Sequence, residues 1–352
     1  METMTSSSST VASPQPQRRR NRWLLWTGRI LLGLLALIVL LAVSGGTYEA
    51  IMRAGDAKRY PPPGQLVDVG GYRLHLHCVG QGSPTVVLDA GLGSFSLDWA
   101  AVQSQLGTST RVCAYDRAGL GWSEPGPSPR NPQQFASELH VLLTNAGVEG
   151  PYVLVAHSIS GKTARLFASQ HSNNVVAGMV LIDARHESVD AHLAPEQLAA
   201  EDTQQRHFQD MIKWTARFGL VRLLWAPAWP RALPGTQNLS PETRTTIGIL
   251  QARPQQIDTA LAEGQGRLES NSSLSSAAPL GDTPLVVLAS SQNIDHLPFW
   301  KEAQQIMAGL SSNSRLVVAS SGHAVHFEQP AIVVESVHQV VDAARTGEPL
   351  QS

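Results

Sequence analysis

The sequence predicts an α/β fold with a mostly parallel sheet, preceded by one apolar helix. Of its 352 residues, 42% are hydrophobic and 15% are charged, which suits a well-buried domain of this class. Short apolar runs rich in Val and Leu alternate with helical patterns, as expected of buried strands joined by helices. Eight runs are typical of strands: two within residues 66–78, and one each at 85–90, 111–115, 152–156, 175–182, 284–289 and 315–319.

The first 64 residues differ in composition from the rest. Residues 1–22 are rich in Ser, Thr, Pro and Gln and are predicted to be a disordered cytoplasmic tail. Residues 23–44 are apolar enough for a transmembrane or signal-anchor helix. Residues 45–64 are charged and then Pro-rich, and are interpreted as a linker.

Charge predicts the orientation of this apolar segment. Four arginines lie just before it, Arg18, Arg19, Arg20 and Arg22, so the N-terminus is expected in the cytoplasm and the following domain outside it. A secreted protein remains the alternative, because Ala42-Val43-Ser44 could be cleaved by a signal peptidase. The body after these residues is slightly acidic and has no basic stripe, which argues against nucleic acid as a partner.

The strongest functional signal lies where the run 152–156 ends in His157-Ser158-Ile159-Ser160-Gly161. A helix-compatible segment, residues 162–169, follows at once. A serine on a tight turn between a buried strand and a helix exposes its hydroxyl beside backbone N–H groups. The glycines of the G-x-S-x-G pattern are replaced by Ala156 and Ser160, which are also small. The turn resembles the nucleophile elbow of the α/β-hydrolase family, with Ser158 as the nucleophile.

Two further segments carry the same resemblance. The stretch YDRAGLGWS, residues 115–123, is similar to a glycine-containing loop of the family, in which Asp116 and Arg117 are expected to pair. The stretch GHAVHFEQP, residues 322–330, is similar to the loop of its catalytic histidine. The resemblance covers residues 65–345 and implies an eight-stranded α/β-hydrolase core at 65–183 and 284–346. Residues 184–283 would form a helical cap between strands six and seven.

The family's order of nucleophile, acid and histidine implies a catalytic triad here. Ser158 and His323 occupy the first and last positions, and His326 is interpreted as a packed support. The acid is expected to be Asp295, the only carboxylate between residues 285 and 300. Asp183 is the alternative, because some lipases place the acid after the sixth strand. The backbone N–H groups of Leu92 and Ile159 are expected to form the oxyanion hole.

The chain has two cysteines, Cys78 and Cys113. In the family's usual strand order their strands are antiparallel neighbours, so an oxidising compartment would permit a disulfide. Two free buried thiols are the alternative. His75 and His77 project to one side of a strand, but two ligands do not make a metal site, so no metal and no cofactor are expected.

The resemblance implies a serine hydrolase that cleaves carboxylic esters. Six cap residues could roof the site and would favour an apolar or acyl-chain substrate: Leu220, Leu223, Leu224, Trp225, Trp229 and Leu233. Contact with the nearby membrane is another use for them. The alternatives are an acyltransferase or an amidase or peptidase with the same triad, and a hydrolase-fold protein that binds a ligand without turnover.

Overall fold

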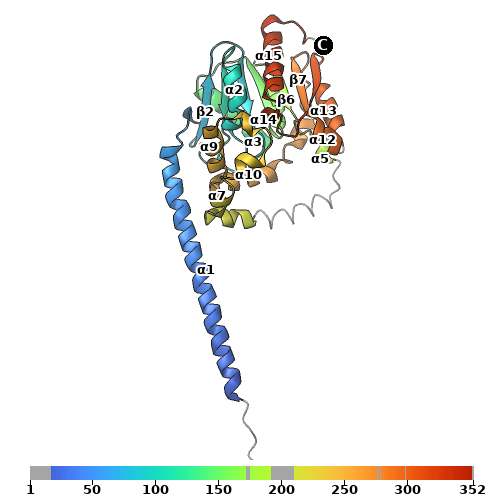
Figure 1. The fold of residues 1–352 in the computed structure, drawn as a ribbon. Helices are drawn as coiled ribbons and strands as arrows, with labels where there is room; N and C mark the ends of the chain where they lie inside the picture. Colours follow the sequence, from blue (N-terminus) through green and yellow to red (C-terminus); the bar gives the residue numbers. More distant parts are fainter. Residues whose placement is uncertain are drawn as a thin grey trace, which may run out of the picture.

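A computed structural model describes residues 17–350, except 172–174, 192–209, 276, 278 and 298. A long helix, α1 (Gln17–Arg59), runs beside a globular domain and then continues beyond it (Figure 1). The predicted tail 1–22 lies mostly outside the described residues, and residues 17–22 belong to α1.

The domain is built on one eight-stranded sheet with the order β1-β2-β4-β3-β5-β6-β7-β8. Strand β2 is antiparallel to both of its neighbours, and the other pairs are parallel, which confirms the predicted fold class. The strands are β1 (Gln65–Asp68), β2 (Arg73–Val79), β3 (Thr85–Asp89), β4 (Val112–Tyr115), β5 (Tyr152–His157), β6 (Val176–Ile182), β7 (Leu285–Ser290) and β8 (Ser314–Ala319).

Helices cover both faces of the sheet. Leu106 of α2 (Ala100–Leu106) and Val337 of α15 (Pro330–Thr346) belong to the apolar core on one face. The core on the other face includes residues of α3 (Pro132–Asn145), α4 (Ser160–Gln170) and α13 (Trp300–Ala308). Shorter elements follow strands at the carboxyl edge: η1 (Ser96–Trp99), α5 (Glu187–Ala191), α12 (Ser291–His296) and α14 (Val325–Glu328).

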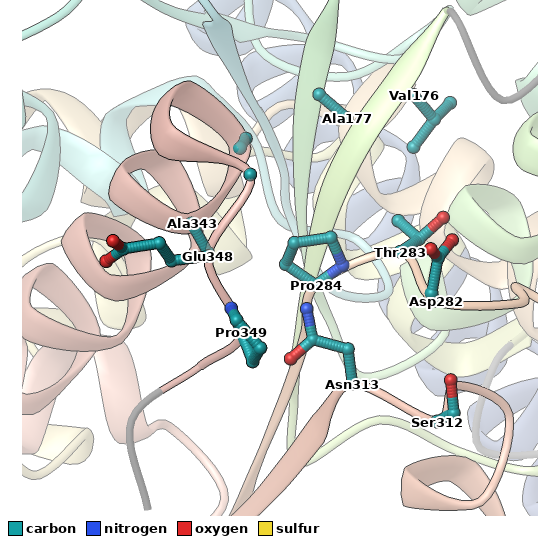
Figure 2. A pocket seen from close by; sticks show the side chains of 12 residues that line it. Val176, Ala177, Asp282, Thr283, Pro284, Ser312, Asn313, Ala343, Glu348 and Pro349 are labelled. Carbon is teal, nitrogen blue, oxygen red and sulfur yellow. The ribbon is translucent and has the colours of Figure 1, made fainter.

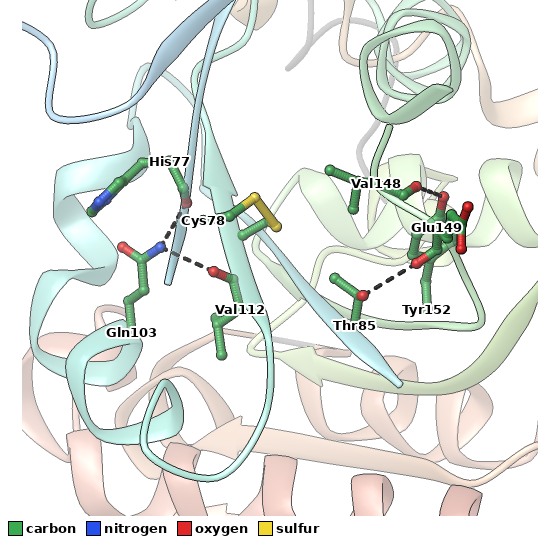
Figure 3. Close-up of a disulfide and its surroundings, with 9 residues drawn as sticks. His77, Cys78, Thr85, Gln103, Val112, Val148, Glu149 and Tyr152 are labelled. Carbon is green, nitrogen blue, oxygen red and sulfur yellow. Dashed lines mark hydrogen bonds between the residues drawn. A yellow bond between two sulfur atoms is a disulfide. The ribbon is translucent and has the colours of Figure 1, made fainter. Parts of the chain in front are cut away.

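The two cysteines lie directly opposite each other on β2 and β4 and are joined by a disulfide (Figure 3). Next to this link, the Gln103 amide donates hydrogen bonds to the carbonyl oxygens of His77 and Val112, at 2.8 and 3.4 Å. Both carbonyls belong to the same two strands, so a covalent bond and a side-chain amide fasten β2 to β4 at one point.

The segment between β6 and β7 is helical over most of its described length, and we refer to it below as the cap. Its described helical elements are α5, the helical residues 210–217, α7 (Leu220–Leu224), α8 (Trp229–Ala232), η2 (Thr236–Asn238), α9 (Pro241–Gln251), α10 (Pro254–Gly266) and α11 (Asn271–Ser275).

The cap's apolar residues do not all lie where the sequence suggested. Trp229 is buried and packs edge-on against Phe327 of the core. In contrast, five of the residues expected to roof the site have exposed side chains: Leu220, Leu223, Leu224, Trp225 and Leu233. Five of the six residues therefore do not enclose the site as the sequence suggested, and the sixth, Trp229, packs against the core.

Helix α1 is longer than the sequence indicated. It is long and apolar enough to cross a membrane between Trp23 and Arg59, and the apolar part is not buried in the protein. Residues 45–59, interpreted as the start of a linker, continue the same helix. They do so because Glu49 and Asp56, two turns apart on one face, both pair with buried Arg222 of the cap.

Candidate active site

Ser158 sits at the tip of the turn between β5 and α4 with a φ of +57°, a conformation that non-glycine residues adopt rarely. The neighbouring residues explain how the turn fits. A Cβ at Gly161 would lie 2.6 Å from the Ala184 Cβ, so only glycine fits there. Ser160 is fully buried, and its hydroxyl donates to the Ala90 carbonyl at 2.5 Å. The small residues thus allow the close approach that the altered motif requires.

Ser158, His323 and Asp183 form a hydrogen-bonded line. The Nε2 atom of His323 lies 3.0 Å from the Ser158 Oγ, and its Nδ1 atom lies 2.6 Å from the Asp183 Oδ2. A carboxylate can only accept, so the His323 Nδ1 carries the proton and Nε2 is left as an acceptor for the serine hydroxyl. The geometry matches that of a nucleophile, a base and an orienting acid.

The Asp183 carboxylate is buried at the end of β6 and is held by donors on both oxygens. Its Oδ1 accepts from the Ser290 N–H at 2.9 Å and from the Trp300 Nε1 at 2.8 Å. Its Oδ2 accepts from the Asn293 amide at 2.5 Å as well as from His323. These donors fix the orientation of the carboxylate, so that one of its oxygens faces the His323 ring.

Asp295, the acid expected from the sequence, does not contact His323. It is an exposed residue of α12. The same helix directs Asn293 toward both Asp183 and His323. Two residues along a helix correspond to a turn of about 200°, so Asp295 points away from the site. Asp183, the alternative from the sequence, occupies the acid position instead.

Buried Arg117 holds the loop after β3 by its carbonyl groups. Its Nη2 donates to the Gly91 oxygen at 2.6 Å, and its Nη1 donates to the Ala90 oxygen at 2.5 Å. Because a trans peptide is planar, the N–H of Leu92 points opposite to the Gly91 carbonyl. The Ser158 carbonyl accepts a hydrogen bond from the Arg185 backbone N–H at 3.1 Å. The Ile159 N–H belongs to the same peptide plane and therefore points in the opposite direction. Neither N–H donates to any residue in the described chain.

The cap takes part in holding this loop. Glu263 of α10 accepts from the Arg117 Nε at 2.7 Å and from the Gly93 N–H at 2.9 Å. Arg117 also pairs with Asp89 at 2.8 Å. The expected pairing of Arg117 with Asp116 is wrong: Asp116 instead contacts the His75 Nδ1 at 3.0 Å. Glu263 lies far from any recognisable motif, which explains why sequence reasoning missed it.

Two further histidines, His157 and His326, lie behind His323 with their rings tilted to one another. The His157 ring lies 4.6 Å from those of His323 and His326, and His326 lies 4.7 Å from the Trp99 ring. The His157 Nε2 donates to the His323 carbonyl at 2.9 Å. Burial and the neighbouring His326 and His323 lower the pKa of His157 well below its usual value. Burial, then His323, lowers the pKa of His326 to about 3.

These neutral histidines predict acid sensitivity. In the unfolded chain a histidine has a pKa near 6.5, so below that pH the unfolded state binds more protons than the fold and stability falls. The contribution of His326 is fully present above about pH 6.5 and is lost as the pH falls toward about 3. Replacing His326→Gln should reduce the loss of unfolding free energy between pH 7 and 5.5 by about 1 kcal/mol. Urea unfolding followed by circular dichroism measures the unfolding free energy at each pH. Parallel pH profiles of this free energy for the wild type and His326→Gln would contradict the prediction.

A separate hollow of about 510 Å³ lies beside the amino ends of three strands (Figure 2). It is lined by Val176, Pro284 and Asn313, which lie at the amino ends of β6, β7 and β8. The candidate catalytic residues follow the carboxyl ends of strands, so this hollow does not serve them. Among the described residues, no group of three or more His, Cys, Asp or Glu side chains could hold a metal ion.

Comparison with known proteins places this geometry in a family context. YqjL of Bacillus subtilis is 24% identical over 282 residues, which cover 78% of this chain and 91% of that protein. The chain spans only 18% and 30% of two other curated relatives, from Hormonema carpetanum and Schizosaccharomyces pombe.

Solved structures share the fold. A thermophilic esterase from Thermogutta terrifontis has a TM-score of 0.59 at 24% identity, covering 80% of this chain and 99% of its own. The Cif epoxide hydrolase from Acinetobacter nosocomialis reaches 0.66 at 14% identity, covering 84% and 96%. A model of the alpha/beta hydrolase family matches residues 86–336, most of the domain. The chain therefore belongs to the α/β-hydrolase family.

Proposed function

We propose that the protein is a serine hydrolase that cleaves carboxylic esters through Ser158, His323 and Asp183. The observation that carries the proposal is the unbroken line of hydrogen bonds from the Ser158 hydroxyl to the Asp183 carboxylate. His323 Nε2 takes the hydroxyl proton as Ser158 Oγ attacks the ester carbonyl, and Asp183 stabilises the imidazolium that forms. The imidazolium then protonates the departing alcohol, leaving an acyl-enzyme.

The negative charge on the substrate oxygen needs donors that are already in place. The N–H groups of Leu92 and Ile159 suit this role, because Arg117 and Arg185 hold the carbonyl groups of the same peptide planes. Water, deprotonated by His323, then attacks the acyl-enzyme and releases the acid. A serine nucleophile favours this chemistry over that of the epoxide hydrolases, whose nucleophile is an aspartate.

We further propose that α1 anchors the protein in a membrane, with the N-terminus in the cytoplasm and the domain on the other side. The apolar segment 23–44 and the arginines before it support this orientation. The Cys78–Cys113 disulfide supports an oxidising compartment for the domain.

A fluorophosphonate probe tests the nucleophile. The wild type should be labelled covalently at Ser158, and Ser158→Ala should lose the labelling completely, because the probe reacts only with an activated serine. Ser104→Ala, on the exposed face of α2, is the matched control and should label like the wild type. Mass spectrometry of the labelled peptide gives the site.

The negative results are informative. Absence of labelling in a wild type that unfolds cooperatively would favour the non-catalytic binding protein. Labelling of Ser158→Ala would refute the nucleophile assignment. With labelling established, hydrolysis rates for matched esters and amides separate an esterase from an amidase.

A further inference from the structure

The cap presents an apolar surface to solvent between residues 210 and 225. Leu224 is 73% exposed and Trp214 is 62% exposed, although both are large apolar side chains. Exposed apolar patches on a folded domain mark sites of contact with another apolar surface. We call this surface the cap face; its residues are Met211, Trp214, Leu220, Leu223, Leu224 and Trp225.

The cap face adjoins the point where α1 leaves the domain. A Cβ at Gly45 of α1 would come within 2.6 Å of the Phe218 carbonyl oxygen, and a Cβ at Gly219 would lie 2.7 Å from the Tyr48 ring. The turn at 218–219 links the two helical segments that carry the cap face. In Figure 1, α7 lies at the end of the domain from which α1 continues alone.

Buried ion pairs fix this arrangement. The Arg222 guanidinium bonds Glu49 at 2.7 and 2.9 Å and Asp56 at 3.0 Å, and all three residues are buried. Removing one partner from a buried charge cluster leaves an uncompensated charge, so the cluster resists separation. The cap face therefore keeps a constant position relative to α1.

The rise per residue of a helix gives the distance of the Gly45 contact from the membrane core. The apolar segment ends near Val43, and Gly45 is two residues further, a rise of about 3 Å. The headgroup layer on each side of a bilayer is several ångströms thick beyond the hydrocarbon core. A cap turn that touches α1 at Gly45 is then level with the headgroups, where Trp side chains are enriched.

A groove of about 620 Å³ opens among these residues. Its apolar lining includes Ile212, Leu220, Leu224, Trp225 and Ile257. Gln251 also lines it, and the Gln251 amide donates to the Gly93 carbonyl at 3.2 Å. Gly93 belongs to the loop that carries Leu92, so one side chain joins the groove to the proposed oxyanion hole.

We propose that the cap face sits in the headgroup layer of the membrane that α1 enters, and that the groove receives an acyl chain of a lipid ester from this layer. The inference rests on the proposed function, both for the anchor and for ester hydrolysis. It adds the surface that meets the bilayer and the class of substrate, an ester that partitions into membranes.

Depth-dependent quenching in reconstituted vesicles tests the surface. The native cysteines are paired, so a single introduced thiol in the full chain can carry an environment-sensitive fluorophore. In phosphatidylcholine vesicles with a nitroxide near the headgroup, the fluorophore at Leu224→Cys should be quenched at least twofold more than at Ile306→Cys. Ile306, on α13, is the matched control because it is also an exposed apolar residue.

A third label, at Ile38→Cys in α1, separates the two proposals. Quenching at Ile38→Cys by deep nitroxides without quenching at Leu224→Cys overturns the docking of the cap face and leaves the anchor standing. Absence of quenching at both positions overturns the anchor and the docking together.

Substrate preference tests the groove. Replacing Leu224→Ser should lower the ratio of kcat/KM for a long-chain ester in vesicles to that for a short soluble ester by tenfold or more. Ile306→Ser should leave this ratio unchanged. A ratio that stays constant in Leu224→Ser, while both esters are hydrolysed, overturns the acyl site. A wild type that hydrolyses neither ester contradicts the proposed function, and the quenching result still decides the docking.

Discussion

Replacing Asp183→Asn should lower kcat for ester hydrolysis by about 10⁴-fold, the effect of the same change in other Ser-His-Asp enzymes. An asparagine amide beside the His323 Nδ1 favours the tautomer whose proton is on Nε2, which then cannot accept the proton of Ser158. The measurement is steady-state kinetics with an activated ester, together with the unfolding temperature, because Asp183 also accepts from Ser290 and Trp300.

Asp295→Asn is the control for this experiment. It changes an exposed carboxylate on α12 that does not contact His323, so kcat should remain within about twofold of the wild type. Loss of turnover in Asp295→Asn alone, with both variants folded, would show that the acid is the one expected from the sequence and that the line of hydrogen bonds is misleading.

Replacing Glu263→Gln should destabilise the fold by about 3 kcal/mol, because it removes one charge from a buried pair with Arg117. It should also lower kcat at least tenfold. Glutamine has one acceptor oxygen where the carboxylate has two, and its NH2 group faces a donor. Either the Arg117 Nε or the pair of donors at the other oxygen, Arg117 Nη2 and the Gly93 N–H, therefore loses its acceptor, and the loop carrying the Leu92 N–H is less well fixed. Loss of one oxyanion donor costs about 10²- to 10³-fold, and a displaced donor should cost part of that.

The control for the cap is Asp258→Asn on the same helix. Its partner, Arg217, is partly exposed, so this pair should contribute about 0–1 kcal/mol. Thermal unfolding and the rate of fluorophosphonate labelling compare the two variants. Equal losses in both would mean that any carboxylate of α10 matters and that the contact with the oxyanion loop has no special role.

Much of the core could be predicted because each strand is a short apolar run bounded by polar or turn-forming residues. Residues 284–289 were expected and Leu285–Ser290 is observed. The turn at Ser158 was also predictable, because its chemistry is contained in consecutive residues. Helix α1 was predicted in its apolar part only: its continuation to Arg59 depends on Arg222, more than 160 residues away in sequence.

The acid and the loop contacts could not be derived from the sequence with the same certainty. Asp183 and Asp295 both follow strands that end at the same edge of the sheet, and sequence position does not tell which way a side chain points. The decision comes from α12, which turns Asn293 inward and Asp295 outward. The roles of Glu263 and His157 depend likewise on contacts across the cap and the core, for which the chain carries no local pattern.

The unbroken course of α1 has a mechanical consequence. A flexible joint after the apolar segment would let the domain swing freely above the bilayer. Here the helix continues for sixteen residues beyond Val43 and is held by the buried ion pairs with the cap. If α1 anchors the protein as proposed, the domain therefore has no flexible joint at the membrane. Any tilt of the anchor would then be transmitted to the catalytic end. The domain would then diffuse in the plane of the membrane with its candidate active site at a fixed height and orientation above the bilayer.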